Sequence, residues 1–143
     1  MASVFDVAQY ILSILGPTST LKLQKLVYYC QVNYIQKTHG DFLFYEDFEA
    51  WVNGPVVREL YQCHRGMLQV RSQDLPGNPA ELSYFEQDCI EDVLREKGNM
   101  YPFDLVEMTH HEIPWIEARQ GCMPNQNSCN VITKEALRNY YGG

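Results

Sequence analysis

Residues 21–34 read Leu-Lys-Leu-Gln-Lys-Leu-Val-Tyr-Tyr-Cys-Gln-Val-Asn-Tyr and form the longest periodic apolar segment of the chain. Ser19 or Thr20 can cap the N-terminus of a helix there, and Gly40 stands where a left-handed C-cap belongs. We therefore predict a helix over about 21–38, around which the rest of the chain packs. The apolar positions share the i, i+3, i+4, i+7 spacing of one helical face, and they are Leu23, Leu26, Val27, Cys30 and Tyr34.

The remaining sequence predicts further helices from apolar spacing, capping residues and Gly or Pro punctuation. Asn53-Gly54-Pro55 is read as a turn with Pro55 at the first helical position. Residues 42–52 alternate weakly and favour one or two short strands. The further helices are expected over about 4–15, from Pro55 to Gly66, from the Ser83 cap to Gly98, and over about 103–110, 114–119 and 134–141.

These elements predict a mainly α protein, with residues 1–143 as a single domain. We expect five to seven helices and at most a small two- or three-stranded β element near residues 42–53. Leu26 and Val27 should lie in the core, whereas Lys22 and Lys25 should be accessible, because a lysine is costly to bury.

The net charge and the lack of long apolar stretches argue against nucleic-acid-binding and membrane proteins. The chain carries a formal net charge of −7 with only 11 Lys and Arg residues, and its pI is near 5.0. A nucleic-acid binder needs a basic face, so neither nucleic-acid binding nor a DNA-binding autorepressor is favoured. No stretch reaches the length of a membrane helix, and the N-terminal segment has no Lys or Arg before Lys22. The sequence thus predicts a cytoplasmic protein without a membrane partner.

The cysteines and histidines give no metal-site pattern. Five cysteines, an odd number, are spread along the chain without Cys-x-x-Cys spacing, which argues against a disulfide framework. Cys122 and Cys129 with His110 and His111 fit no structural zinc spacing. We therefore expect no metal and no cofactor.

One cluster could in principle support catalysis. His110, Glu112 and Arg119 combine an imidazole, a carboxylate and a guanidinium, the groups of acid–base chemistry. No nucleophile or second carboxylate accompanies them, so an enzyme remains the lesser alternative and we assign no catalytic residue. An open pocket joining the three side chains would favour it.

Three separated motifs resemble those of a known family. They are Lys-Leu-Gln-Lys-Leu-Val-Tyr-Tyr at 22–29, Glu-Ala-Trp-x-x-Gly-Pro-Val-Val-x-Glu-Leu-Tyr at 49–61 and Thr-His-x-Glu-x-Pro-Trp-x-x-Ala-Arg at 109–119. In this order they resemble the Panacea domain, also called the SocA-like antitoxin domain, and the resemblance covers nearly the whole chain. Arg58 departs from the pattern, since Pro is frequent in the family at that place.

The resemblance implies an antitoxin of a toxin–antitoxin system, borne by a prophage or another mobile element, that neutralises a cognate toxin by direct protein–protein binding. An alternative within the family is an adaptor that delivers the toxin to a protease. We expect a monomer or a weak homodimer.

The motif residues fall into two expected roles. Trp51, Gly54, Pro55, His110, Pro114 and Trp115 are expected to be structural. The partner-binding candidates are Lys22, Lys25, Tyr28, Tyr29, Arg58 and Tyr61, because interface energy concentrates in aromatic and basic side chains.

Overall fold

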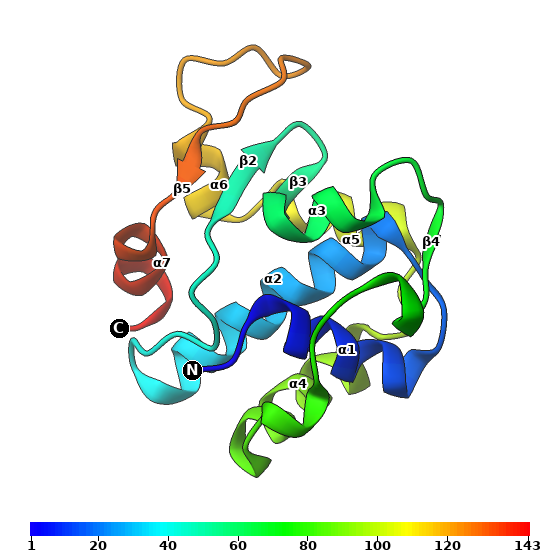
Figure 1. The fold of residues 1–143 in the computed structure, drawn as a ribbon. Coiled ribbons are helices and arrows are strands. Elements are labelled where there is room, and N and C mark those ends of the chain that lie inside the picture. The colour runs from blue at the N-terminus through cyan, green and yellow to red at the C-terminus, as the bar shows by residue number, and fades with distance from the viewer.

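Helix α2 (Thr20–Thr38) runs through the middle of the protein in the computed structural model, which describes residues 1–143 (Figure 1). The other elements pack around it, and the loop of residues 121–130 projects from the end of the molecule that carries α6 and β5. The other helices are α1 (Val4–Leu15), α3 (Arg58–His64), α4 (Tyr84–Lys97), α5 (Pro102–Thr109), α6 (Ile113–Ala118) and α7 (Lys134–Tyr141), with short 3₁₀ turns at Ser72–Asp74 and Pro79–Glu81.

Two small antiparallel sheets complete the fold. β2 (Phe48–Trp51) lies in the middle of a three-stranded sheet in the order β3-β2-β5, with β3 (Gly54–Val57) and β5 (Val131–Ile132) at its edges. β1 (Thr18–Ser19) pairs with β4 (Gln69–Val70). The prediction of a mainly α protein with a small β element is confirmed. β1, β4 and β5 were not predicted, because strands of two residues are too short to show a period.

Several predicted caps are present. The Ser83 hydroxyl accepts from the Glu86 amide, and the Glu86 carboxylate accepts in return from the Ser83 amide. At the end of α2 one detail is wrong: the left-handed residue after the helix is His39, with φ 57°, and Gly40 follows it with φ 124°. Two consecutive residues of positive φ reverse the chain there.

The helix predicted from Pro55 begins later, at Arg58. Gly54 and Pro55 belong to β3, which pairs with β2 through a two-residue turn. Proline lacks an N–H and is tolerated in a sheet mainly on an edge strand, and β3 is an edge strand. Gly54 has φ 108°, a conformation that favours glycine. The Gly-Pro pair therefore closes a hairpin and does not start a helix.

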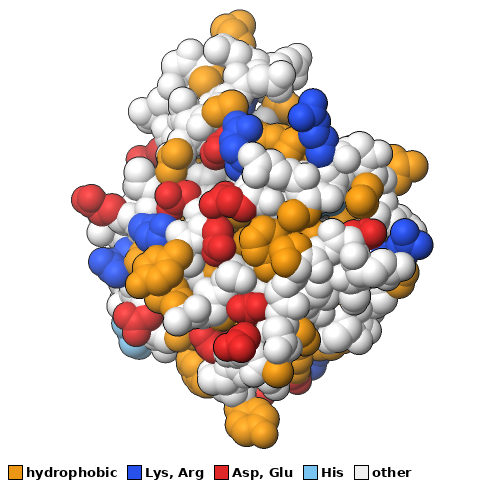
Figure 2. Space-filling view, viewed as in Figure 1, with side chains coloured by type: hydrophobic (Ala, Val, Ile, Leu, Met, Phe, Trp, Pro, Cys, Tyr) orange, Lys and Arg blue, Asp and Glu red, His pale blue; other side chains and the backbone are white.

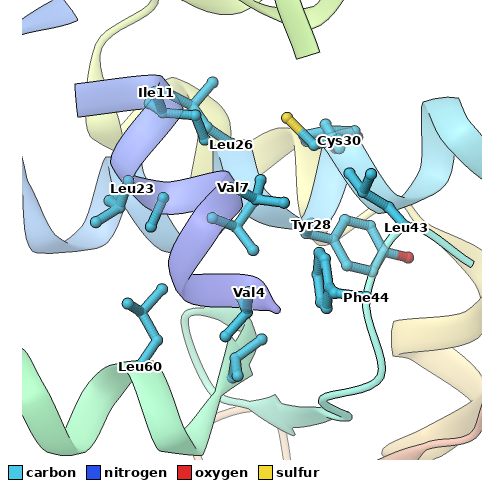
Figure 3. Close-up of a cluster of buried hydrophobic side chains, with 14 of the residues drawn as sticks. Val4, Val7, Ile11, Leu23, Leu26, Tyr28, Cys30, Leu43, Phe44 and Leu60 are labelled. Carbon is cyan, nitrogen blue, oxygen red and sulfur yellow. The ribbon is translucent and has the colours of Figure 1, made fainter. Parts of the chain in front are cut away.

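The core surrounds α2. Leu26 and Val27 are fully buried, which confirms that prediction, and Figure 3 shows Leu26 in one cluster with Val4, Val7 and Ile11 of α1. The prediction that Lys25 is accessible is wrong, since its exposed fraction is 0%. A one-sided helix would have left Lys25 in solvent, but α2 is covered by helices on one side and by the β2–β3 hairpin on the other.

Candidate functional site

Lys25 lies under the β2–β3 hairpin. Its Nζ donates to the main-chain oxygen of Pro55 at 2.9 Å. A Cβ at Gly54 would stand 3.0 Å from Lys25 Cε and 2.5 Å from Thr109 Oγ1, so glycine lets the turn lie directly on the lysine. Burial lowers the pKa of Lys25 to about 7, because desolvation disfavours the ammonium form.

Gln24 binds the outer edge of the same hairpin. Its side-chain oxygen accepts from the Val57 amide at 2.9 Å, and its Nε2 donates to the Val57 carbonyl at 3.3 Å. Nε2 also lies 3.0 Å from His64 Nε2, and since an amide nitrogen only donates, this ring nitrogen accepts. Burial lowers the pKa of His64, which favours the neutral ring that this arrangement needs.

Two adjoining pockets open above these residues. The first has a volume of about 240 Å³, and Lys25 and His64 line it. The second, of about 390 Å³, is lined by Arg58 and Arg65. Trp51, Tyr61 and Asn127 line both pockets. We call the two pockets together the Trp51–Tyr61 groove.

A row of side chains in edge-to-face contact runs along the groove, and two of them, Trp51 and Tyr61, line both pockets. The Trp51 and Tyr61 rings meet edge to face with centroids 4.8 Å apart, and the Tyr61 ring meets the His64 ring at 5.6 Å. The guanidinium of Arg58 stands 5.6 Å from the centroid of the Trp51 ring. Trp51 and Tyr61 are only half-buried, so this row offers apolar surface to a ligand.

The groove is basic in an acidic protein. Neither pocket has an Asp or Glu among its lining residues. Arg58 forms a bidentate pair with Glu49, with both N···O distances 2.9 Å, and this pair holds the pKa of the Glu49 carboxyl below its usual value. Arg65 is exposed and forms no ion pair within 4.0 Å. Figure 2 shows blue side chains on either side of an orange patch in the upper part of the molecule, where Figure 1 places β2, β3 and α3.

The partner-binding candidates do not share one surface. Arg58 and Tyr61 meet at the groove, whereas Lys22 is half-buried beside a different pocket. Lys25 and Tyr28 have exposed fractions of 0%, and that of Tyr29 is 6%. These three are therefore corrected to core positions, where they hold α2 to its neighbours and cannot meet a partner in this conformation.

The motif histidine and the second tryptophan brace the hairpin from its other side. His110 stacks on Trp115 with ring centroids 4.6 Å apart, and His110 Nε2 lies 3.0 Å from the Val52 oxygen. Trp115 Nε1 donates to the Trp51 oxygen at 2.9 Å. Pro114 is buried in the first turn of α6. The contacts made by this part of the motif are structural.

Glu112 and Arg119 are engaged elsewhere. The Glu112 carboxylate accepts from the Tyr141 hydroxyl at 2.5 Å and from the Tyr29 hydroxyl at 3.3 Å, which joins α2, α6 and α7. Arg119 is buried and donates to main-chain carbonyls, among them Ala50 O at 2.9 Å and Gln126 O at 2.6 Å. None of the five main pockets is lined by His110, Glu112 or Arg119.

Sequence reasoning missed the polar side chains that position the hairpin. Gln24 and Gln31 are seven residues apart, so they lie on one side of α2, and this repeat of a buried amide was the available signal. For Arg65 and His64, no sequence pattern beyond the residue type predicted a place in the groove. The structure contains no group of three or more His, Cys, Asp or Glu side chains arranged to hold a metal ion, and all five cysteines are free thiols.

No helix combines the length and the apolar character that crossing a bilayer requires.

The chain has no match among curated proteins or among solved structures. The family model described as "Antitoxin SocA-like, Panacea domain" matches residues 23–116 of the 143, which is more than half of the chain. This range includes α2 from Leu23 onward, the β2–β3 hairpin with Gly54 and Pro55, and the His110–Trp115 stack. The chain therefore belongs to the SocA-like Panacea antitoxin domain family.

Proposed function

We propose that this protein is an antitoxin that neutralises a cognate toxin by binding it directly. Family membership over residues 23–116 is the observation that carries the proposal. The polar motif residues support it as well, because His110, Glu112 and Arg119 each bind a structural partner and none of them lines one of the five main pockets. The protein acts, on this proposal, as one domain of residues 1–143 that binds as a monomer or a weak homodimer.

The accessible part of the motif surface lies at the Trp51–Tyr61 groove. Arg58 and Tyr61 remain as partner-binding candidates there, and Lys22 remains beside a separate pocket. Aromatic and arginine side chains in a hollow are the usual anchors of protein–protein interfaces. The groove is therefore the first surface to test.

On this proposal the toxin is encoded by the gene adjacent to this one on a prophage or another mobile element, and the deciding experiment is co-expression with the product of that adjacent gene. We expect the adjacent product to arrest growth alone, growth to recover when both are expressed, and the two proteins to co-purify. A failure of both rescue and co-purification would overturn the proposal.

Purified components separate direct binding from delivery to a protease. If the antitoxin occludes its toxin, the two purified proteins alone abolish the toxin's activity. If protection instead requires a cellular protease, and toxin levels fall while mixing the purified proteins has no effect, the protein is an adaptor and direct neutralisation is wrong.

A further inference from the structure

We propose that the Trp51–Tyr61 groove binds a short acidic segment of the toxin in extended form, with its carboxylates toward Arg65 and Arg58. This inference rests on the proposed function and adds the chemistry of the partner. It commits to a peptide segment because the two pockets follow one another across the Trp51 and Tyr61 rings. Successive side chains of an extended chain can occupy such pockets in turn.

Charge complementarity is the main support. The chain has 18 Asp and Glu residues, yet none of them lines the groove. The pockets along α4 differ, since Asp92 and Glu96 line one and Glu91 lines another. The pocket beside Lys22 also lacks Asp and Glu, but it has no arginine or aromatic ring in its lining. A hollow without carboxylates that is lined by Arg58 and Arg65 offers a local site for an anionic partner.

The basic side chains of the groove differ in whether they already have an acidic partner. Glu49 neutralises Arg58 in part, but it lies outside the lining of both pockets. Arg65 has no acidic neighbour within 4.0 Å and stands at the rim. Lys25 lies at the floor of the first pocket, but its amine is buried against the Pro55 carbonyl and burial lowers its pKa, so it adds no exposed positive charge to the groove. A carboxylate entering the second pocket would thus meet the unpaired guanidinium of Arg65, while at Arg58 it would compete with Glu49.

The aromatic row supplies the second part of the recognition. Trp51 and Tyr61 present half-exposed ring surface between the two pockets, and the amide of Asn127 is available beside them. An acidic segment that carries an aromatic or aliphatic side chain would use both features. A nucleic acid could also stack on these rings, but a long polyanion would be repelled by a protein of net charge −7, whereas a short segment meets only the groove.

The test uses the full-length protein and a matched pair of peptides. The probe is the pentapeptide Glu-Glu-Phe-Glu-Glu with blocked termini, and its control replaces every Glu by Gln. We expect the acidic peptide to shift the NMR signals of the Trp51 indole, Tyr61 and Arg65, and to bind at least about tenfold more tightly than the Gln peptide, a difference of roughly 1.4 kcal/mol.

Two charge reversals locate the site. Arg65→Glu should weaken binding of the acidic peptide at least about tenfold. Arg95→Glu, an equally large charge change at an exposed arginine of α4 outside the groove, should leave the affinity unchanged. Thermal melts of both variants should match the parent, because Arg65 makes no ion pair and the exposed Arg95 pair is worth little.

The proposal is overturned if the acidic peptide shifts no groove signal, if the Gln peptide binds equally well, or if Arg95→Glu weakens binding as much as Arg65→Glu. Tighter binding of single-stranded oligo(dT) than of the peptide would also overturn it. If the parent and Arg65→Glu bind the toxin equally well, the groove is not the binding site, and the antitoxin function is unaffected. If the parent forms no complex with the toxin, the proposed antitoxin function is wrong, whatever the peptide experiment shows.

Discussion

The two sides of α2 hold their neighbours by different means. The side toward α1 and α4 packs through apolar side chains such as Leu26 and Cys30 (Figure 3). The side toward the β2–β3 hairpin and the loop that precedes it uses polar side chains, each bound to a main-chain group. They are Gln24 to Val57, Lys25 to Pro55, and Gln31 to Leu43 and Phe44.

The difference follows from how many main-chain N–H and C=O groups each neighbour leaves without a hydrogen-bond partner. A helix pairs most of its own N–H and C=O groups, so its partner needs to supply only apolar contact. β3 is an edge strand whose outer side has no neighbouring strand, and the carbonyls of Pro55 and Val57 point outward together with the Val57 N–H. Gln24 and Lys25 take the place of the missing strand. A central helix beside a short sheet therefore needs buried amides and even a buried amine.

The largest effect is expected on the apolar side. Leu26→Ala should lower the free energy of unfolding by roughly 2 to 5 kcal/mol, because Leu26 is fully buried and its removal leaves a cavity. Urea denaturation measures the change, with Ile14→Ala as the control, since Ile14 is 48% exposed. If Leu26→Ala unfolds no earlier than the parent, the apolar side does not carry the core.

A somewhat smaller effect is expected on the polar side. Gln31→Leu removes the acceptor for the Leu43 amide, now 2.6 Å away, and the donor to the Phe44 carbonyl, now 3.0 Å away. Each buried group left unpaired costs about 1 to 3 kcal/mol, so we expect a loss of about 2 kcal/mol or more, with faster hydrogen exchange at the Leu43 amide. Gln36→Leu is the matched control, because Gln36 is exposed on the same helix. An equal effect of both changes would show that a buried amide at position 31 is not required.

The sequence predicted the apolar side of α2 and missed the polar side for one physical reason. Leu23, Leu26 and Val27 follow a helical period, because an apolar neighbour requires an apolar side chain on every turn of the helix face that it covers. Gln24 and Lys25 bind the backbone of a hairpin more than 25 residues away in sequence, so no apolar period marks them as buried, and the only local signal is the repeat of Gln24 at Gln31. The same cause placed Pro55 in a helix, since its role on an edge strand depends on a sheet that the local sequence did not show.

The candidate site was predicted in part for the same reason. Residue type indicates Arg58 and Tyr61 as interface residues, and the structure places both at one groove. Tyr28 and Tyr29 were chosen by the same rule, yet α2 is covered on that side by Phe48, Tyr141 and Glu112. Residue type therefore indicated what an interface uses, while burial, which depends on the whole fold, decided which residues are available.

The buried amine of Lys25 makes the free energy of unfolding depend on pH. Its pKa is about 7 in the folded protein and 10.5 as a free side chain, because burial disfavours the charge. Between these values the unfolded chain binds more protons than the folded one, so the free energy of unfolding rises with pH from about 7 upward. The contribution reaches at most about 1.4 kcal/mol per pH unit.

The measurement is urea denaturation at several values of pH from about 7 to 8, below the pKa of roughly 8.5 at which an unfolded cysteine such as Cys30 loses its proton and below that of the tyrosines, whose pKa values burial also raises. We expect Lys25→Met to remove most of the rise. Lys134→Met, at a lysine paired with Asp47 near the surface, should keep it. A slope that survives in Lys25→Met would mean that the amine is not the group responsible.

The smallest effect is expected at the rim of the apolar side, where α4 meets the end of α2. Asp92 pairs there with Lys37 of α2 and with Arg95, and the neighbouring cations hold the pKa of the Asp92 carboxyl below its usual value. The side chains of both cations are more than one-third exposed, so water and salt weaken the attraction. Asp92→Asn should therefore cost less than about 1 kcal/mol, and the difference from the parent should shrink in 1 M salt, where the Debye length is about 3 Å. Asp88→Asn, at an exposed carboxylate of the same helix without an ion pair, is the control. A loss as large as that of Leu26→Ala would mean that ion pairs, rather than apolar contact, hold α4 to α2.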